Sequence, residues 1–439
     1  MLRSSVTAAV GVIALGLTSC TAPGSAPAPT KSAKPPMPAT ISLAVYGSEP
    51  VLATYVELVK SFEVQYPKVR VKLQTFSDHA KAMASVVDQA KADATPDLFM
   101  VTQADLPQLR SERISRPVDE LLGERHLDFG DGYERVALES YSADAHLQCM
   151  PTEVSPLVVY YNPALVKLRS LVPPGDRLPN ASSGWSFQQF AKAARSASTQ
   201  RSRGVEVPRD LNHFAPFILS AGGSLVDDPA KPTKLSLETP ESLAGLRPLL
   251  RLLRRPEHVY TAGELAQRGA VQRFMDGRLG MLVGDRTLTP VIREKPGFLF
   301  GTMPMPKLSR NATTAMIKGF CLAKKSEHPD QAADLLAFLS SEDSAKALAR
   351  TGYIVPTNIA ALRSTAFAQP GGNPRGSAAF TDQMRSVMPM PAGPAWDQVV
   401  AATQLPVGQL LVKPVIAPLK PRMVEINALA ATYFVKPAS

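Results

Sequence analysis

Three short polar loops near the start of the chain contain side chains suited to hydrogen-bonding chemistry. They span residues 47–50, 77–79 and 102–105 and carry carboxylates, an amide and hydroxyl groups. Carboxylates accept hydrogen bonds, and amides and hydroxyls also donate them, so these loops suit the recognition of a polar ligand. Pairs of Asp and Glu could also support hydrolysis of glycosidic bonds. The residue types therefore allow both binding and acid–base catalysis.

The sequence lacks the local patterns that usually accompany metal, nucleotide or nucleophile chemistry. Its six histidines, at positions 79, 126, 146, 213, 258 and 328, include no pair with metal-ligand spacing. No zinc signature, P-loop or G-x-S-x-G nucleophile turn occurs in the chain. We therefore expect a protein that is not an enzyme and that uses no metal or cofactor.

Alternating predicted strands and helices place the three polar loops at one edge of a sheet. Apolar patterns predict strands at 41–46, 69–75 and 97–101. Helical spacing of apolar residues over 55–62, and a second helical segment over 80–91, predict the helices between them. This order is typical of a parallel sheet with helical crossovers, in which ligands bind beyond the carboxyl ends of the strands. The three loops are therefore the first candidates for a binding site.

A second α/β unit is expected from about Pro151 onward. It contains predicted strands and helices of ordinary length, at 157–161, 187–197, 243–253, 263–275 and 280–283. A further helix after Ser326 has Ala332, Leu335 and Leu339 on one face. About 400 residues from Ile41 onward exceed what one hydrophobic core usually holds, so we expect two domains.

The first 40 residues have the composition of an export signal and a tether. Arg3 precedes an apolar run, residues 8–17, which is shorter than the about 20 residues that span a bilayer. The run ends in Leu-Thr-Ser-Cys, which resembles a bacterial lipobox, so residues 1–19 are expected to be removed and Cys20 to carry a lipid anchor. Residues 20–40 are rich in Pro, Ala and Ser and are expected to form an extended tether.

The net charge of +10 raises the question of an anionic partner. The basic residues are scattered, and the densest group, 247–255, falls on a helical pattern whose other face is leucine. Export also argues against nucleic acid as a partner. We therefore interpret this group as a solvated basic surface, favoured beside anionic lipid headgroups.

Several short motifs in a fixed order resemble one family. They are Thr95-Pro96-Asp97-Leu98-Phe99, Met150-Pro151 leading to Tyr160-Tyr161-Asn162-Pro163, Gly184-Trp185-Ser186-Phe187, Ala221-Gly222-Gly223, Phe274-Met275-Asp276-Gly277, Thr302-Met303-Pro304 and Gly352-Tyr353-Ile354-Val355-Pro356. Each motif alone is a weak signal, but their order over about 300 residues is specific. From Ile41 to the C-terminus, the chain resembles the extracellular solute-binding proteins of ABC importers, in the sugar-binding group that includes maltose-binding protein.

This resemblance implies a fold, a function and partners. The implied fold is α/β and two-lobed, with a mainly parallel sheet in each lobe and a hinge of several strands. The first lobe would comprise residues 41–149 and 322–355, and the second 152–319 and 356–439. The implied function is capture of a carbohydrate in the cleft between the lobes and its delivery to an ABC permease with its ATPase. We expect a monomer, held by its lipid anchor on the outer face of the cytoplasmic membrane.

The resemblance also places the candidate ligand contacts, in loops at strand ends and beside the hinge. They are Glu49, Asp78, Gln103, Asp105, Glu153, Asp210, Asn212, Arg286, Gly319, Tyr353 and Trp396. A purely structural role is the alternative for three of them. Asp78 could cap a helix without contacting a ligand, Trp396 could pack the lobe, and Gly319 could serve close strand packing. As a ligand contact, Trp396 would stack on the apolar face of a sugar ring.

The charge of these candidates favours one ligand class and leaves alternatives. Five of the ten side-chain candidates are carboxylates, which would favour an amino sugar through a charge-assisted hydrogen bond. Arg286 stands where sugar-binding relatives often carry an aromatic residue, and it could instead hold the phosphate of a glycerophosphodiester or sugar phosphate. A lipoprotein enzyme acting on cell-wall glycans and a non-transport adhesion or scaffold protein are the rivals from other classes.

Two cysteines remain after Cys20, and the resemblance brings them together. It implies that residues 147–151 and 318–323 are neighbouring strands of the hinge. A bridge between Cys149 and Cys321 would then link these strands, as is common for exported proteins. The alternative is a pair of free, buried thiols.

Overall fold

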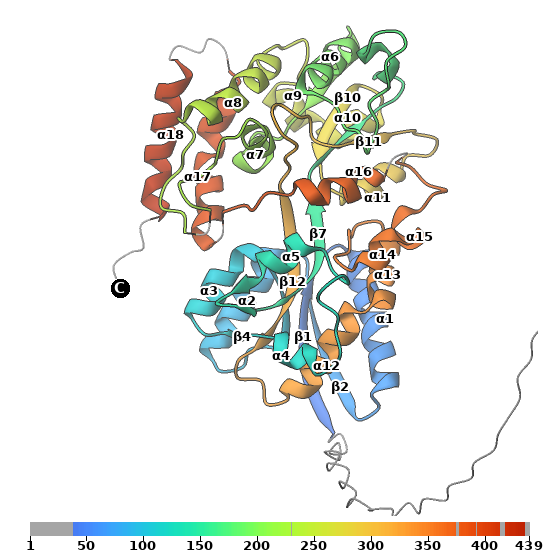
Figure 1. Cartoon of the computed structure of the whole chain (residues 1–439), viewed down its shortest axis with the longest axis vertical. Helices are drawn as coiled ribbons and strands as arrows, with labels where there is room; N and C mark the ends of the chain where they lie inside the picture. Colours follow the sequence, from blue (N-terminus) through green and yellow to red (C-terminus); the bar gives the residue numbers. More distant parts are fainter. Residues whose placement is uncertain (1–37, 230, 375–376, 392, 413–417, 435–439) are drawn as a thin grey trace, which may run out of the picture. The chain divides into compact units, whose positions relative to one another are not determined.

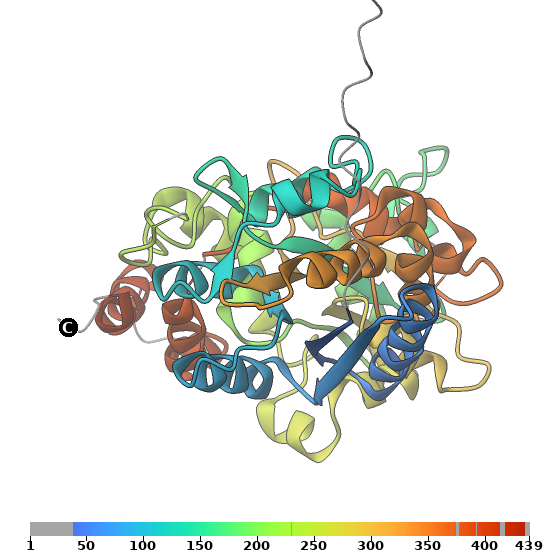
Figure 2. The same ribbon diagram turned by 90° about the horizontal axis from the view of Figure 1, so that it is seen from below.

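The computed structural model describes residues 38–229, 231–374, 377–391, 393–412 and 418–434, to which all structural statements refer. The expected signal peptide, Cys20 and the tether up to residue 37 lie outside the described residues. Residues from Pro38 onward form one compact unit, shown in Figure 1 and from below in Figure 2. None of its described helices combines the length and the apolar character that crossing a membrane requires.

The first sheet has six strands in the order β2-β1-β3-β12-β4, with β7 also paired to β12. Its parallel part is formed by β1 (Ala39–Tyr46), β2 (Val69–Phe76) and β3 (Leu98–Thr102). The antiparallel part is formed by β12 (Ala315–Ala323) with β3, β4 (Ser115–Arg116) and β7 (Met150–Pro156). Every residue of β3 is buried, as its continuous apolar sequence predicts for a central strand covered on both faces.

The second sheet has four strands in the order β11-β8-β10-β9. They are β8 (Val158–Tyr161), β9 (Arg203–Glu206), β10 (Leu279–Gly284) and β11 (Gly301–Met303). Only β10 and β9 are parallel, whereas β8 pairs with both β10 and β11 in antiparallel fashion. The predicted α/β class is confirmed, but both sheets are mixed rather than mainly parallel, because the chain returns to each sheet in the opposite direction.

Helices cover both sheets. Those near the first sheet are α1 (Glu49–Gln65), α2 (His79–Lys91), α3 (Leu106–Ser111), α4 (Asp119–Gly123), α5 (Arg135–Ser140), α12 (Pro329–Ser340) and α13 (Glu342–Arg350). Those near the second sheet are α6 (Phe187–Ala197), α7 (Leu211–Ser220), α8 (Pro240–Leu253), α9 (Ala262–Gln267), α10 (Ala270–Met275) and α11 (Leu288–Arg293). The single helix predicted over 263–275 is wrong: the backbone is extended at Arg268 and Gly269, and Gly269 begins a new helix.

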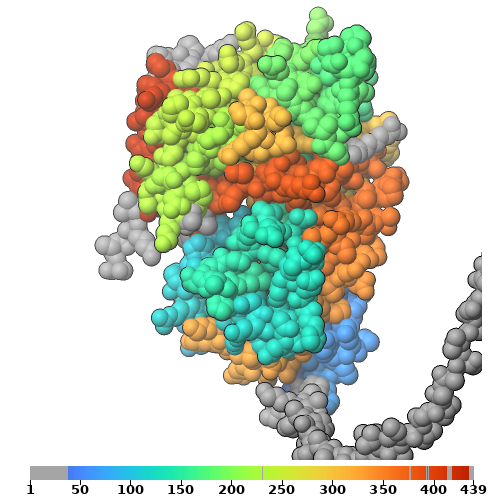
Figure 3. Space-filling view, viewed as in Figure 1, coloured from blue at the N-terminus to red at the C-terminus, as the bar shows by residue number. Residues whose placement is uncertain are grey.

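The C-terminal part is helical. It contains α14 (Ile359–Arg363), α15 (Thr365–Ala368), α16 (Ala378–Gln383), α17 (Pro394–Gln409) and α18 (Leu419–Phe434). The segment around α16 crosses the junction between the two sheets, where it forms the deep-orange band in Figure 3. Hydrogen bonds between Thr313 and residues 386–388 hold it there. The lobe boundaries expected from the resemblance stay a prediction.

Two clusters of buried apolar side chains stabilise these layers. The first surrounds the six-stranded sheet, with Phe99 and Leu336, and continues to Tyr160 and Phe380 at the second sheet. The second lies under α6, α7 and α8 and includes Phe190 and Trp396. Burying each large apolar side chain contributes about 1.5–3 kcal/mol, so these clusters hold the loops between them in fixed positions.

β7 and β12 run side by side between the two sheets (Figure 1). A disulfide joins Cys149, next to β7, to Cys321 in β12. A Cβ added at Gly319 would lie 2.6 Å from the carbonyl oxygen of Met150 and 2.9 Å from Cα of Pro151. Gly319 therefore permits close strand packing, which was the alternative to its predicted contact with a ligand.

Candidate functional site

A cavity of about 200 Å³ is lined by residues that follow strands of both sheets. Thr102, Gln103 and Ala104 lie at the carboxyl end of β3, and Asp285 follows β10. The first turns of three helices contribute further lining residues: His79 from α2, Asn212 and His213 from α7, and Trp396 and Asp397 from α17. We call this cavity the junction pocket. Its position matches the rule that α/β proteins bind ligands beyond the carboxyl ends of their strands.

Aspartates before two of these helices decide where the helices begin. The carboxylate of Asp78 accepts a hydrogen bond from the backbone of Lys81 at 3.0 Å, so α2 begins at His79. Asp210 accepts one from the backbone of His213 at 3.0 Å, so α7 begins at Leu211. The backbone N–H groups in the first turn of a helix have no acceptor within the helix, and these two carboxylates supply one. They thereby fix where each helix begins and the direction of the residues that follow.

His79 is held by Asp105 at the edge of the junction pocket. Its Nε2 lies 2.8 Å from Oδ2 of Asp105, an oxygen that also accepts hydrogen bonds from the backbone and hydroxyl of Thr102. Burial opposes protonation of His79, but its hydrogen bond to Asp105 and the charge of that carboxylate raise the pKa of the imidazole above its usual value. Asp105 is therefore engaged in positioning His79.

Trp396 and Asn212 both line the junction pocket and are joined by a hydrogen bond, although 184 residues separate them. The indole Nε1 donates a hydrogen bond of 3.1 Å to Oδ1 of Asn212. Just before α17, the backbone N–H of Gly393 donates to the carbonyl of Ala104 at 2.9 Å, which connects this segment with the loop after β3. The Trp396 side chain is only 3% exposed, yet it lines the pocket, so it serves both packing and the site.

Two carboxylates, those of Asp285 and Asp397, line the junction pocket. Asp285 accepts a hydrogen bond from the backbone of Thr287 at 3.0 Å through Oδ1. Reduced solvation raises the pKa of the Asp397 carboxyl, His79 opposes this shift, and the charge of Asp105 adds to it. Burial opposes ionisation of Asp210, but its hydrogen bonds with His213 dominate and lower the pKa of that carboxyl. The pocket therefore has an acidic side that can attract a cationic group.

The junction pocket brings together three of the predicted ligand contacts: Gln103, Asn212 and Trp396. Gln103 also bonds to the start of β12, because its Oε1 accepts a hydrogen bond of 2.8 Å from the backbone of Ile317. Asp105 and Asp210 lie directly behind the lining, where they hold His79 and His213. These two carboxylates position pocket residues and do not line the pocket themselves.

The remaining predicted contacts lie elsewhere. Glu49 is an exposed residue in the first turn of α1, and Asp78 is an N-cap whose hydrogen bonds lower the pKa of its carboxyl to about 2. Glu153 is paired with Lys318 across β7 and β12, and Tyr353 packs against the first core. Gly319 lies inside β12. None of these five residues lines the junction pocket.

Arg286 requires a correction, because its side chain is fully buried away from the junction pocket. Its guanidinium donates hydrogen bonds to the carbonyls of Gly352 and Phe367, at 3.0 and 3.2 Å. It also lies over the rings of Phe367 and Phe380, 4.7 and 5.1 Å from their centroids. Burial lowers the pKa of Arg286 to about 10, and the side chain has no path to a ligand phosphate in this conformation.

Sequence reasoning missed the four ionisable residues of the junction pocket: His79, His213, Asp285 and Asp397. Each of them directly follows or precedes a residue that was predicted, namely Asp78, Asn212, Arg286 and Trp396. The loops were therefore identified, and the error lies in which residue of each loop faces the cavity. Ser155, Thr314 and Met390 also line it and carried no signal in the sequence.

We expect His79→Gln to destabilise the protein more in acid than in alkaline solution. The pKa of His79 is raised in the folded state, so its stabilising contribution is complete below the unfolded value of about 6.5 and is lost as the pH rises through the folded value. Urea unfolding of wild type and variant should differ by about 1 kcal/mol near pH ~5.5 and by less near pH ~9.

His126→Gln is the matched control, since His126 is exposed and forms no ion pair within the described segments. Its effect on the free energy of unfolding should not change with pH. Equal effects of His79→Gln at both pH values would show that the pair with Asp105 does not stabilise the fold.

Comparison with known proteins identifies relatives of this architecture. A family model described as bacterial extracellular solute-binding protein matches residues 57–374, more than half of the chain. The sugar-binding protein MalE from Xanthomonas citri superposes with a TM-score of 0.77 at 16% identity, over 90% of this chain and 97% of that chain. Lmo0181 from Listeria monocytogenes, in complex with cycloalternan, superposes with a TM-score of 0.74 at 18% identity, over 90% and 98%.

The GacH receptor of Streptomyces glaucescens, solved unliganded and with acarbose, superposes with a TM-score of 0.71 at 18% identity, over 91% of this chain and 98% of that chain. At such identities the likeness establishes the two-domain fold. No curated protein matches in a sequence search.

Proposed function

Since this chain belongs to the bacterial extracellular solute-binding protein family, we propose that it captures a carbohydrate in the junction pocket and delivers it to an ABC importer. Capture requires hydrogen bonds to hydroxyl groups and an apolar surface for the sugar ring. The pocket offers Gln103 and Asn212 for the first purpose and the indole of Trp396 for the second.

The observation that carries this proposal is that residues from both sheets line the junction pocket. Gln103 follows a strand of the first sheet, whereas Asp285 follows a strand of the second. A ligand that touches both would favour a conformation in which the two parts close on it and exclude water. The neighbours solved with cycloalternan and acarbose support a carbohydrate as the ligand class.

The charge of the junction pocket supports an amino sugar over a phosphate ester. Its described lining contains two carboxylates, Asp285 and Asp397, and neither Lys nor Arg. An ammonium group on the ligand would form charge-assisted hydrogen bonds with these carboxylates. Arg286, the residue that motivated the phosphate alternative, is buried against Phe367 and Phe380. The described lining therefore lacks the Arg or Lys side chain that a glycerophosphodiester would require of this site, and its basic groups are His79 and His213.

Calorimetric titration tests this proposal. We expect glucosamine-type ligands to bind more tightly than the corresponding neutral sugars, and glycerophosphodiesters to give no heat. Asp285→Asn and Asp397→Asn should reduce the preference for the amino group, each by about tenfold, because one charged hydrogen bond is worth about 1.5 kcal/mol or more.

Asp176→Asn serves as the control, because Asp176 is exposed and outside the pocket. Failure of every amino sugar to bind would contradict the amino-sugar assignment, and failure of all carbohydrates would contradict the wider proposal. Turnover of a labelled glycan would instead favour a glycan-processing enzyme, and absence of ligand-induced closure in solution scattering would favour an adhesion or scaffold role.

Delivery to an importer further requires that the protein stay beside the membrane. Cys20, as the lipidated N-terminus after removal of residues 1–19, would provide this anchor. We expect Cys20→Ser to release the protein into the medium. Metabolic labelling with a radioactive fatty acid should mark the wild type and leave the variant unlabelled.

A further inference from the structure

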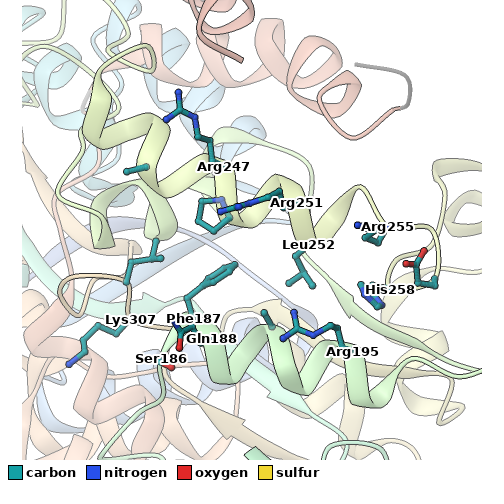
Figure 4. A pocket seen from close by; sticks show the side chains of 15 residues that line it. Ser186, Phe187, Gln188, Arg195, Arg247, Arg251, Leu252, Arg255, His258 and Lys307 are labelled. Carbon is teal, nitrogen blue, oxygen red and sulfur yellow. The ribbon is translucent and has the colours of Figure 1, made fainter. Parts of the chain in front are cut away.

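A wide groove lies between α6 and α8, on the part of the molecule that contains the second sheet (Figure 4). Its cavity volume is about 1190 Å³, larger than the usual site for a small ligand. Figure 4 shows Arg247 and Arg251 on α8, and Phe187 and Arg195 on α6, among the side chains that line it. We call it the basic groove, and its cations are Arg195, Arg247, Arg251, Arg255 and Lys307.

Three cations of the basic groove form a row along the wall made by α8. Arg247 and Arg251 are one helical turn apart on α8, about 6 Å along its axis, and Arg255 follows just beyond the helix end. Arg195 stands on the facing helix near the same end as Arg255, and Lys307 lies at the opposite end (Figure 4). The sequence predicts that the basic residues in 247–255 form only a solvated surface. In the structure, Arg247, Arg251 and Arg255 line a concave site.

This row lacks salt-bridge partners among the residues that the structure describes. None of the five cations forms a salt bridge within the described parts of the chain, and Glu257 is the one acid among the lining residues. Burial lowers the pKa of the His258 imidazole, the charge of Glu257 opposes this shift, and the charges of Arg195 and Arg255 add to it. Like charges one turn apart destabilise a helix, so Arg247 and Arg251 lower the stability of α8.

The floor of the basic groove is apolar. Phe187 is 8% and Leu252 is 5% exposed, and Pro248 and Ala191 lie beside them. A free phosphate ion or a chain of phosphates has no apolar groups that could contact such a floor. A flat bilayer surface cannot enter between two helices. The combination favours a narrow ligand that carries both acidic and apolar groups.

The occupant must come from another molecule. The segments outside the described residues, including 1–37, 413–417 and 435–439, contain no Asp or Glu. A second copy of the chain is disfavoured by a net charge of +10 on each copy. Charge complementarity therefore requires an acidic partner.

We propose that the basic groove binds an acidic, amphipathic peptide segment of a partner protein. The 11 residues of α6 span about 16 Å, a length that about five extended residues cover. Alternate side chains of an extended peptide lie about 6.6 Å apart, close to the axial spacing of Arg247 and Arg251. Acidic side chains on one face of the peptide can thus pair with the row, while apolar ones on the other face contact Phe187 and Leu252. This proposal is independent of the ligand of the junction pocket.

Fluorescence anisotropy with a labelled peptide of alternating glutamate and leucine tests the proposal. The full mature chain should bind this peptide, and the affinity should fall as the ionic strength rises. R247E/R251E should raise the Kd at least about tenfold, the factor expected for loss of one charged hydrogen bond. Lys307→Glu, an exposed single substitution at the other end, should also weaken binding. A glutamate–serine peptide should bind less tightly than the glutamate–leucine peptide.

The matched control is R135E/R177E, which changes the net charge equally at exposed residues outside the groove. The circular dichroism spectrum should be the same in all variants, which verifies that they fold. Equal peptide affinity of wild type and R247E/R251E would overturn the proposal, and so would absence of peptide binding. Arg247-dependent binding of polyphosphate or phosphatidylglycerol vesicles, without peptide binding, would assign the groove to those anions and overturn it too.

Discussion

Replacing Trp396 by alanine is expected to weaken carbohydrate binding at least about thirtyfold, because a central buried aromatic residue in a binding site usually contributes about 2 kcal/mol or more. The indole lines the junction pocket and donates a hydrogen bond to Asn212. Without it, a sugar ring would lose its apolar contact surface, and Asn212 would lose the partner that orients its amide. Calorimetric titration of variant and wild type with the same sugar measures the change.

The same substitution should lower the free energy of unfolding by about 3–5 kcal/mol, since Trp396 is 3% exposed and belongs to the second core. Phe190→Ala separates the two effects. Phe190 is fully buried in the same core and lies outside the junction pocket, so this variant should lose similar stability and keep its affinity for the sugar. Trp396→Phe keeps a ring and removes only the indole N–H. Unchanged sugar affinity in Trp396→Ala would show that the indole serves packing alone.

Removal of the disulfide is expected to have the second large effect. Cys149 and Cys321 are separated by 172 residues, and closing so long a loop in the unfolded chain should contribute about 3–5 kcal/mol to stability. C149A/C321A should therefore unfold at a clearly lower urea concentration than the oxidised wild type. Both sulfur atoms are buried between β7 and β12, so alanine at these positions introduces no polar group.

Reduction of the wild type provides the control for this prediction. Wild type treated with dithiothreitol should unfold at nearly the same urea concentration as C149A/C321A, whereas the variant itself should not respond to the reductant. Thiol titration of denatured, unreduced protein should find Cys149 and Cys321 without free thiols. If oxidised and reduced wild type are equally stable, the bridge does not stabilise the fold.

Local patterns in the sequence predict most of the first sheet. The strand expected at 69–75 is observed as Val69–Phe76, and the helix expected at 80–91 as His79–Lys91. These elements depend on periodic burial of apolar side chains and on Asp78 as a helix cap, which are properties of neighbouring residues. The antiparallel strand β12 is different, because it joins the first sheet from a position more than 200 residues after β3. No local pattern specifies that pairing.

In the junction pocket, too, the local sequence determines the position of a loop, and tertiary packing determines which of its residues faces the cavity. The sequence located the turn after β10, but Arg286 points into a cluster of Phe367 and Phe380, while its neighbour Asp285 lines the pocket. Adjacent residues in a turn point in different directions, and which of them faces a cavity depends on what packs against the turn. The aromatic residues that bury Arg286 lie about 80–95 residues further along the chain.

The spacing of the basic residues in the sequence predicts that they lie on α8. It predicts only one of the two walls of the basic groove. Arg195 and Phe187 come from α6, more than 50 residues earlier, and only tertiary packing places them opposite Arg247 and Arg251. By itself, then, the sequence determined most elements of the first sheet, the cap at Asp78 and the loops that hold polar groups, because these depend on neighbours along the chain. Tertiary structure alone decided which side chain of each loop reaches the junction pocket and that a charged helix face becomes a groove, because both depend on contacts between distant segments.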